Sequence, residues 1–420
     1  MSRLRGNAGL CGALTRGYPD VAVVETTNTP PGRAAFVSLY IAVAVAMVGL
    51  GIIAPILPLY AERFAANRFS LGIVFAAFSI SRSILGPFVG RLSDWIGRRR
   101  ILLLGLGGFA VLSALYIATD SLWQMGVVRF LQGAASVMVT PIAQAYVGDH
   151  TPKGKEGWMM NLFYSAMFVG MAVGPLLGGW IGEVWSYSTA FAAMGILSVV
   201  ALILVAATVP TDRRARSARP EEKPAIVPLR QVLSHDAVKA IGAYFVTRGF
   251  WRQGFTAFYP LFAVSLAGFG EASVGLVLFA YMLAGGILQI PFGWLADRLP
   301  RVPMILAGSL GAPALLFAVP FARSLTGILL LSFGMGAMSA LSRASVLAIR
   351  TELGRTHGMG TVAGLQSSAI AVGRMIGPLA SGLVADLAGV AAVFPLGGGI
   401  GLLGTGLVWL WLRRWRGEAR

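Results

Sequence analysis

Residues 90–100 read GRLSDWIGRRR, and residues 293–301 read GWLADRLPR. A shift of 203 residues brings the two segments into register. The same shift aligns glycines, prolines and charges along both halves: Gly90 with Gly293, Asp94 with Asp297, Arg98 with Arg301, Gly105 with Gly308, Gly133 with Gly336, Asp149 with Glu352, and Gly174-Pro175 with Gly377-Pro378. Apolar residues match by chance in a hydrophobic chain, but turn and charge residues rarely match in one register. The chain therefore consists of two related halves.

The composition places both halves in a lipid bilayer. Of the 420 residues, 56% are hydrophobic and 12% charged, and the mean hydropathy is +0.74. This leaves too little polar surface for a water-soluble protein of this size. Apolar runs of about 20 residues, long enough for a helix to cross about 30 Å of hydrocarbon, recur along the whole chain. They lack the short alternating pattern of a membrane β-barrel.

We therefore expect an all-α integral membrane protein with 12 transmembrane helices in two pseudo-symmetric six-helix bundles. The expected spans are 34–60, 70–91, 101–119, 122–147, 158–182, 189–209, 237–266, 272–296, 303–322, 326–349, 360–386 and 391–412. The expected domains are an N-terminal tail 1–33, a bundle 34–209, a linker 210–236, a bundle 237–412 and a C-terminal tail 413–420. Because six spans leave both halves in one orientation, their pseudo-axis runs along the membrane normal and a cleft separates them.

The net charge of +17 is explained by topology rather than by nucleic acid. With a cytoplasmic N-terminus, 25 of the 34 Lys and Arg residues fall in cytoplasmic segments or at their edges, 3 fall outside and 6 lie within spans. This is the positive-inside bias. We expect a monomer that spans the plasma membrane (the inner membrane of a bacterium) many times, with both termini cytoplasmic. Cys11 is the single cysteine, so no disulfide, metal site or cofactor is expected.

The segment 90–100 falls in the short cytoplasmic loop after the second span. Asp94 can accept hydrogen bonds at a helix end, and the basic residues Arg98 and Arg99 can pair with it. The segment resembles the loop signature of the major facilitator superfamily, a Gly, an Asp four residues later, then Gly97 and a basic cluster. Asp297 and Arg301 belong to its degenerate copy. The resemblance implies a role in conformational change; the alternative is a charged loop that only fixes the topology.

The fifth span contains GMAVGPLLGGWIG at residues 170–182, with a glycine at every fourth position. Such a face is flat and lets a neighbouring helix pack closely, while Pro175 weakens one backbone hydrogen bond. Gly170, Gly174, Pro175, Gly178 and Gly179 resemble the antiporter motif of the superfamily, which marks drug:proton exporters more than importers. We expect a hinge here and at the aligned Gly377-Pro378. As packing alone, the glycines would need no exporter.

Polar residues form one stripe on the fourth span and another on the seventh. Arg129, Gln132, Ser136 and Thr140 recur at helical spacing, and the pair Arg129 and Gln132 resembles the superfamily motif associated with proton coupling. The alternative is that Arg129 braces the bundle. The resemblance implies that spans one, four, seven and ten line the cleft. The substrate-binding residues expected there are Arg129, Gln132, Ser136, Thr140, Tyr244, Arg248, Arg252 and Arg343.

The expected cleft is basic, because the middle of no span contains Asp or Glu. Guanidinium groups suit carboxylates and phosphates, so the substrate should carry negative charge or be an amphiphile with an anionic head. The alternative is that some of these arginines do not face the cleft, and that their side chains snorkel to a membrane interface or contact helix C-termini. Arg82 and Arg374, each shortly before a Gly-Pro, are interpreted as gate or bracing residues.

The resemblance predicts a secondary transporter and not an enzyme. We expect the protein to export a small amphiphilic or anionic organic compound by alternating access. Protons are the candidate coupling ion, and exporters of this kind are connected with multidrug resistance. One alternative is a facilitator or importer of an organic anion. The other is a membrane scaffold or sensor that keeps the fold without transporting.

Overall fold

The computed structural model describes residues 33–64, 67–151, 155–210 and 229–418, and every regular element in these ranges is a helix. Most of the expected N-terminal tail and of the linker 210–236 lies outside the described residues. We call the helix ends that are predicted to be extracellular the outer ends, and the opposite ends the inner ends.

The first half consists of six long helices, one for each expected span. They are α1 (Arg33–Ala61), which is followed by the 3-10 turn η1 (Glu62–Phe64), α2 (Arg68–Ile96), α3 (Arg98–Ile117), α4 (Leu122–His150), α5 (Glu156–Val184) and α6 (Tyr187–Thr208). Polar caps fix several outer starts, since Asn67, Ser121 and Ser186 each accept a hydrogen bond from the backbone N–H three residues later. Such caps satisfy donors that a helix start leaves free.

The second half repeats this order after a short helix in the linker. Its elements are α7 (Leu229–Ser234), α8 (Asp236–Ser265), α9 (Glu271–Ile287), α10 (Gln289–Arg298), α11 (Arg301–Ala318), η2 (Val319–Phe321), α12 (Leu325–His357), α13 (Met359–Ala388), η3 (Val390–Ala392) and α14 (Val393–Glu418). The expected eighth span is thus divided into α9 and α10. Pro291 explains the break, because it lacks an N–H and its ring clashes with the carbonyl four residues earlier. The C-terminal helix also runs past the expected end of its span at 412.

In the described residues, eleven helical segments are long and apolar enough to cross a membrane, when α9 and α10 are counted as one segment. By position α8 is the twelfth; it has 30 residues, but Arg248, Arg252 and Gln253 in its middle lower its hydropathy. Helix α8 is therefore the span that stands out by its polar middle.

Large side chains are exposed near helix ends elsewhere, such as Trp95 at 85% and Trp123 at 79%. Aromatic residues at these depths suit the membrane interface.

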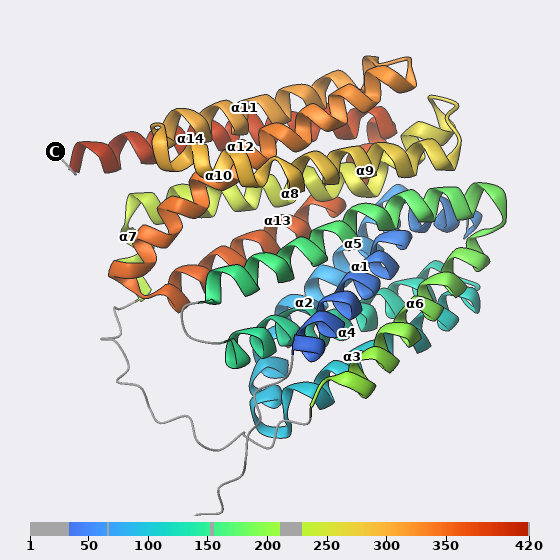
Figure 1. Ribbon diagram of the computed structural model, residues 1–420. Coiled ribbons are helices and arrows are strands. Elements are labelled where there is room, and N and C mark those ends of the chain that lie inside the picture. The colour runs from blue at the N-terminus through green and yellow to red at the C-terminus, as the bar shows by residue number, and fades with distance from the viewer. Residues whose placement is uncertain (1–32, 65–66, 152–154, 211–228, 419–420) are drawn as a thin grey trace, which may run out of the picture.

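The two halves pack their helices in the same way. Helix α1 lies against α5 and α6, and its counterpart α8 lies against α13 and α14. Helix α2 packs on α4, and α9 packs on α12. The halves meet along two seams, α5 with α9 and α2 with α13 (Figure 1). These four helices therefore carry the contact that must change if the halves move.

Glycines let helices touch through their backbones on and beside these seams. A Cβ atom on Gly174 would lie 2.5 Å from the Cα of Gly51 and 2.6 Å from the carbonyl oxygen of Val48, both on α1. On Gly179 it would lie 3.0 Å from the Cα of Gly275 on α9. The glycine face of α5 thus serves two partners, α1 in its own half and α9 in the other half.

The outer ends of the halves are joined by two matching carboxylate caps. Asp386, at the end of α13, accepts hydrogen bonds from the backbone N–H groups of Arg68 (2.6 Å) and Phe69 (2.9 Å) at the start of α2. Glu183, at the end of α5, accepts one from Ala272 N (2.7 Å) at the start of α9. The 203-residue shift aligns Glu183 with Asp386 and Phe69 with Ala272, so the two caps occupy equivalent positions in the repeat. A carboxylate at a helix N-terminus is stabilising, so each seam is closed at its outer end.

Replacing Gly174 by Ala should destabilise the fold. The added Cβ meets backbone atoms that cannot move aside alone, so α1 and α5 must separate, at a cost of about 1–3 kcal/mol. Thermal unfolding of the purified protein measures the loss. Gly107→Ala is the matched control, because nothing lies within 4 Å of a Cβ at that helical glycine. Equal melting temperatures for the two variants would contradict the backbone contact.

Removing the two outer caps should open the outer ends. Each lost cap costs about 0.5–2 kcal/mol, so Glu183→Ala combined with Asp386→Ala, which removes the accepting oxygens, should shift the population toward longer distances between halves. Double electron–electron resonance between spin labels at the exposed positions 123 and 321, in a Cys11→Ser background, measures this shift. Asp120→Ala removes an outer carboxylate outside the two caps and should change nothing. An unchanged distance distribution in the double variant would show that the two carboxylate caps do not hold the outer ends together.

Candidate functional site

Five arginines from four helices gather where the halves face each other. They are Arg82 on α2, Arg248 and Arg252 on α8, Arg343 on α12 and Arg374 on α13. Arg374 is close enough to feel the charge of each of the other four. Within the described ranges, none of the five forms an ion pair with Asp or Glu. All five side chains are partly buried, and positive charge without a counter-charge is costly within a membrane span.

Two of these arginines line a cavity between the halves. It has a volume of about 560 Å³ and lies between α2 and α4 of the first half and α13 of the second. Its lining residues are Ser79, Arg82, Ser83, Gly86, Pro87, Val137, Pro141, Gly364, Ser367, Ser368, Ile370, Ala371 and Arg374. Hydroxyl and guanidinium groups thus face a space of the size that small ligands occupy.

The two cavity arginines differ in how they are held. Arg82 Nη1 donates a hydrogen bond to Ser136 Oγ at 2.7 Å, which fixes the guanidinium against α4. For Arg374, the described residues provide no hydrogen bond and no ion pair. Five N–H donors in a planar fork suit a carboxylate, sulfonate or phosphate. The Arg374 guanidinium is therefore available to a ligand.

Arg343 and Arg252 extend the cluster toward the other seam. Arg343 lies over the ring of Phe168 on α5, with 5.1 Å between Cζ and the ring centroid, so this side chain reaches the opposite half. Cation–π contacts of this kind stabilise a guanidinium without neutralising it. Arg252 interacts with Tyr281 of α9. Both arginines therefore belong to the region between the halves, and their role in substrate binding stays a prediction.

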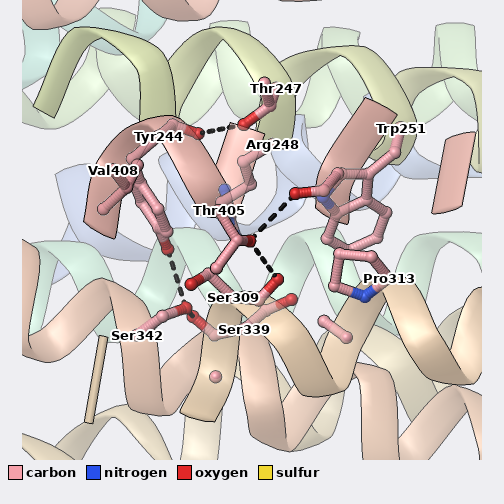
Figure 2. A pocket seen from close by; sticks show the side chains of 13 residues that line it. Tyr244, Thr247, Arg248, Trp251, Ser309, Pro313, Ser339, Ser342, Thr405 and Val408 are labelled. Carbon is pink, nitrogen blue, oxygen red and sulfur yellow. Dashed lines mark hydrogen bonds between the residues drawn. The ribbon is translucent and has the colours of Figure 1, made fainter. Parts of the chain in front are cut away.

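Tyr244 points into the second half rather than across the cleft. Its hydroxyl lies 2.9 Å from Ser342 Oγ, and Figure 2 shows it with Arg248, Ser309 and Thr405 around a small pocket between α8, α11, α12 and α14. The pocket volume is about 10 Å³, room for about one water molecule. Arg248 lines this pocket and also acts on Arg374, so it connects the pocket with the cluster.

Arg129 and Gln132 are not part of the cluster, contrary to the expectation that the whole stripe of α4 faces the cleft. Arg129 is 6% exposed and donates to Gln132 Oε1 at 2.6 Å, an oxygen that also accepts from the hydroxyl of Tyr116 at 3.0 Å. Its guanidinium lies over the rings of Phe75 and Phe78. All these partners belong to the first half, so the contacts favour the bracing role.

The remaining stripe residues have separate partners. Ser136 reaches the site through its hydrogen bond with Arg82. Thr140 Oγ1 lies 3.9 Å from Met47 Sδ on α1. The stripe is therefore shared among α1, α2 and α3, because these helices surround α4 on different sides.

The motif loops form matching ion pairs at the inner ends. Arg98 bridges Asp94 at 2.8 Å and Asp149 at 3.0 Å, and the aligned Arg301 bridges Glu352 at 2.8 Å. Gly97 has a φ of 98°, which favours glycine. Each pair stays within one half. A gating role for Gly90, Asp94, Arg99 and Asp297 stays a prediction.

Arg82 and Arg374 line the cavity, although neither was among the residues predicted from the sequence to bind the substrate. The available signal was a charge in the middle of an apolar span, which is expensive unless solvated or paired. The serines that join them are small and common in membrane helices, so nothing in their spacing singles them out.

Comparisons with known proteins give one consistent family. The model of the Major Facilitator Superfamily matches residues 39–271 and 252–419. Multidrug resistance protein 2 of Bacillus subtilis is 26% identical over 382 residues, 90% of this chain and 94% of that protein. The quinolone resistance protein NorA of Staphylococcus aureus is 22% identical over 378 residues, 88% and 94% of the two chains.

Solved structures show the same fold. A bacterial homologue of the human lysosomal transporter Spinster, in an inward-facing and occupied conformation, aligns with a TM-score of 0.78, 13% identity and coverage of 91% of this chain and 97% of that one. The human organic anion transporter MFSD10 aligns with a TM-score of 0.64, 19% identity and coverage of 90% and 100%. Proteins of this fold and family are transporters and not enzymes. The chain is a multi-pass membrane protein that belongs to the major facilitator superfamily.

Proposed function

We propose that the protein exports a small anionic or amphiphilic organic compound across the inner membrane by alternating access, in exchange for protons. The observation that carries this proposal is the cluster of five arginines, drawn from both halves, without a carboxylate partner in the described residues. An anion bound there would touch both halves at once. Its binding would therefore bias the equilibrium between the two cleft conformations.

The direction of transport rests on the glycine face of α5. Its five motif positions match the antiporter pattern, and the structure places Gly174 against α1 and Gly179 against α9. One helix thus connects a contact inside its half with a contact between the halves. The drug resistance proteins of Bacillus subtilis and Staphylococcus aureus, which cover most of this chain, support export.

The sign of the substrate rests on the chemistry of the cleft. A lipophilic cation would need a carboxylate in this region, and the described carboxylates lie at helix ends, as Asp386 and Glu183 do. An anion would offset the mutual repulsion of the arginines. The name of the structurally similar human organic anion transporter agrees with this choice.

A second candidate is a facilitator or importer of an organic anion. The observation in its favour is the same lack of a carboxylate in the middle of the described spans, because an arginine does not release a proton near neutral pH. A coupling proton would then need another carrier, such as an outer carboxylate or the substrate itself.

Transport into inverted membrane vesicles separates these candidates. Naphthalene-2-sulfonate, a permanently charged amphiphile, should accumulate in the lumen when the lumen is acidic, and a protonophore should abolish the accumulation. Vesicles without the protein provide the background. Equilibration that ignores the proton gradient would instead identify a facilitator, and no uptake above background would leave the scaffold interpretation.

Arg252→Ala and Arg343→Ala should each raise the KM for the transported anion. Loss of one charge-assisted hydrogen bond corresponds to about 1.5–3 kcal/mol, or about a 10- to 100-fold weaker affinity. Concentration-dependent uptake in the same vesicles measures the change. Arg323→Gln removes an exposed charge outside the cluster and should leave the KM unchanged. Unchanged affinity in both alanine variants would remove these arginines from the site.

A further inference from the structure

We propose that Arg82 and Arg374 hold the anionic head of the substrate, and that its apolar body lies against the opposite seam, formed by α5 and α9. This inference rests on the proposed function and adds to it a site and an orientation. The predicted ligand class is an amphiphile with a sulfonate, carboxylate or phosphate head joined to an apolar body of ring size.

The head-group site is built from both halves. Arg82 and Arg374 line the same 560 Å³ cavity from α2 and α13, and each lies near the middle of its helix. Ser79 and Ser368 add hydroxyl groups to the lining, whereas Ser83 and Ser367 donate to the backbone carbonyl oxygens of Ser79 and Ala363. An anion in this cavity would therefore be contacted by two cations and by neutral hydroxyl groups, which is a donor set that suits oxyanions.

The hydrogen bonding of the two arginines leaves capacity for a ligand. Arg82 uses one N–H to hold Ser136, which fixes the guanidinium and leaves its other donors available. Arg374 has no hydrogen-bond or ion-pair partner among the described residues. The two positive charges repel each other across the cavity. A bound anion removes this repulsion and satisfies the donors at the same time.

The internal repeat shows that the other seam has a different chemistry. A shift of 203 residues places Met171 at the position of Arg374, Phe168 at that of Ala371, and Met282, Gly285 and Gly286 at those of Ser79, Arg82 and Ser83. At these positions the α5–α9 seam lacks both arginines and the hydroxyls of α2, although Tyr164 and Ser165 keep hydroxyls at the positions of Ser367 and Ser368. Phe168 packs on α9 here, since a Cβ on Gly286 would lie 3.7 Å from Phe168 Cβ.

Arg343 connects the two sides of the cleft. It comes from α12, acts electrostatically on Arg374, and lies over the ring of Phe168. Phe168 therefore borders the region that the arginines share. A substrate with its head at Arg82 and Arg374 would have its body directed toward Phe168 and Met171, where burial of apolar surface adds to the affinity.

Isothermal titration of the purified protein in phosphatidylcholine nanodiscs tests the head-group site. The probes are naphthalene-2-sulfonate, its neutral analogue naphthalene-2-sulfonamide, and the cation 2-naphthyltrimethylammonium. The sulfonate should bind the unmodified protein at least about 10-fold more tightly than the other two, since only it gains charge-assisted hydrogen bonds. Equal affinity for all three probes would overturn the proposal.

Arg82→Gln and Arg374→Gln should each weaken sulfonate binding by about 10- to 100-fold and leave sulfonamide binding within about 3-fold. Arg82→Lys and Arg374→Lys keep the charge and should retain part of the preference, and retained sulfonamide binding shows that the glutamine variants fold. Arg323→Gln is the matched control for loss of an exposed charge. Loss of binding of every probe in the glutamine variants, with a lowered melting temperature, would indicate a structural role and overturn the assignment.

The orientation is tested with a change in the body of the probe. Phe168→Ala should reduce the affinity ratio of naphthalene-2-sulfonate to benzenesulfonate, because the larger ring system loses its contact, whereas Arg82→Gln should leave this ratio unchanged. A ratio that changes only in Arg82→Gln would place the body elsewhere and refute the orientation.

The binding experiments and the transport experiments test different claims, so a negative result in one leaves the other claim standing. If the sulfonate binds through Arg82 and Arg374 but does not accumulate in inverted vesicles, the site stands and export is wrong. If it accumulates but the glutamine variants bind it normally, export stands and the head-group site is wrong.

Discussion

The structure depends on helices that approach each other through their backbones. Lipid chains are as apolar as leucine, so membrane helices gain little from the hydrophobic effect and need close van der Waals contact. Gly174 provides it between α5 and α1, and Gly179 provides it between α5 and α9 of the other half. These contacts pack α5 within the first bundle and form one of the two seams between the bundles. Replacing a glycine here should therefore affect both the stability of the bundle and the contact between the bundles.

The outer caps use the same geometry. Because the helices meet closely at their outer ends, the carboxylates of Glu183 and Asp386 reach the free N–H groups of the opposite half. A cap of this kind costs little to break, about 0.5–2 kcal/mol. The ion pairs of Arg98 and Arg301, by contrast, stay within single halves and keep the inner loops in place.

The arginine cluster is the feature that stability does not explain. Desolvated charges without partners oppose folding, and Arg374 lacks even a hydrogen bond among the described residues. Such a group is retained only if a ligand or a conformational change uses it. Arg129 shows the contrasting case, since its hydrogen bond to Gln132 and its two aromatic neighbours account for it within the first half. Two arginines in apolar spans thus have different roles because their surroundings differ.

The sequence alone determined the duplication, the all-helical membrane fold and the approximate limits of the spans, and it predicted a basic cleft. Length, hydropathy and turn residues are local properties, and the 203-residue register made them comparable between halves. Only the tertiary structure decided which arginines meet. Helical spacing shows that Arg129 and Thr140 share a face, but it does not show which neighbouring helix covers each part of that face. The packing of distant segments placed Arg129 inside the first half and brought Arg374 opposite Arg82.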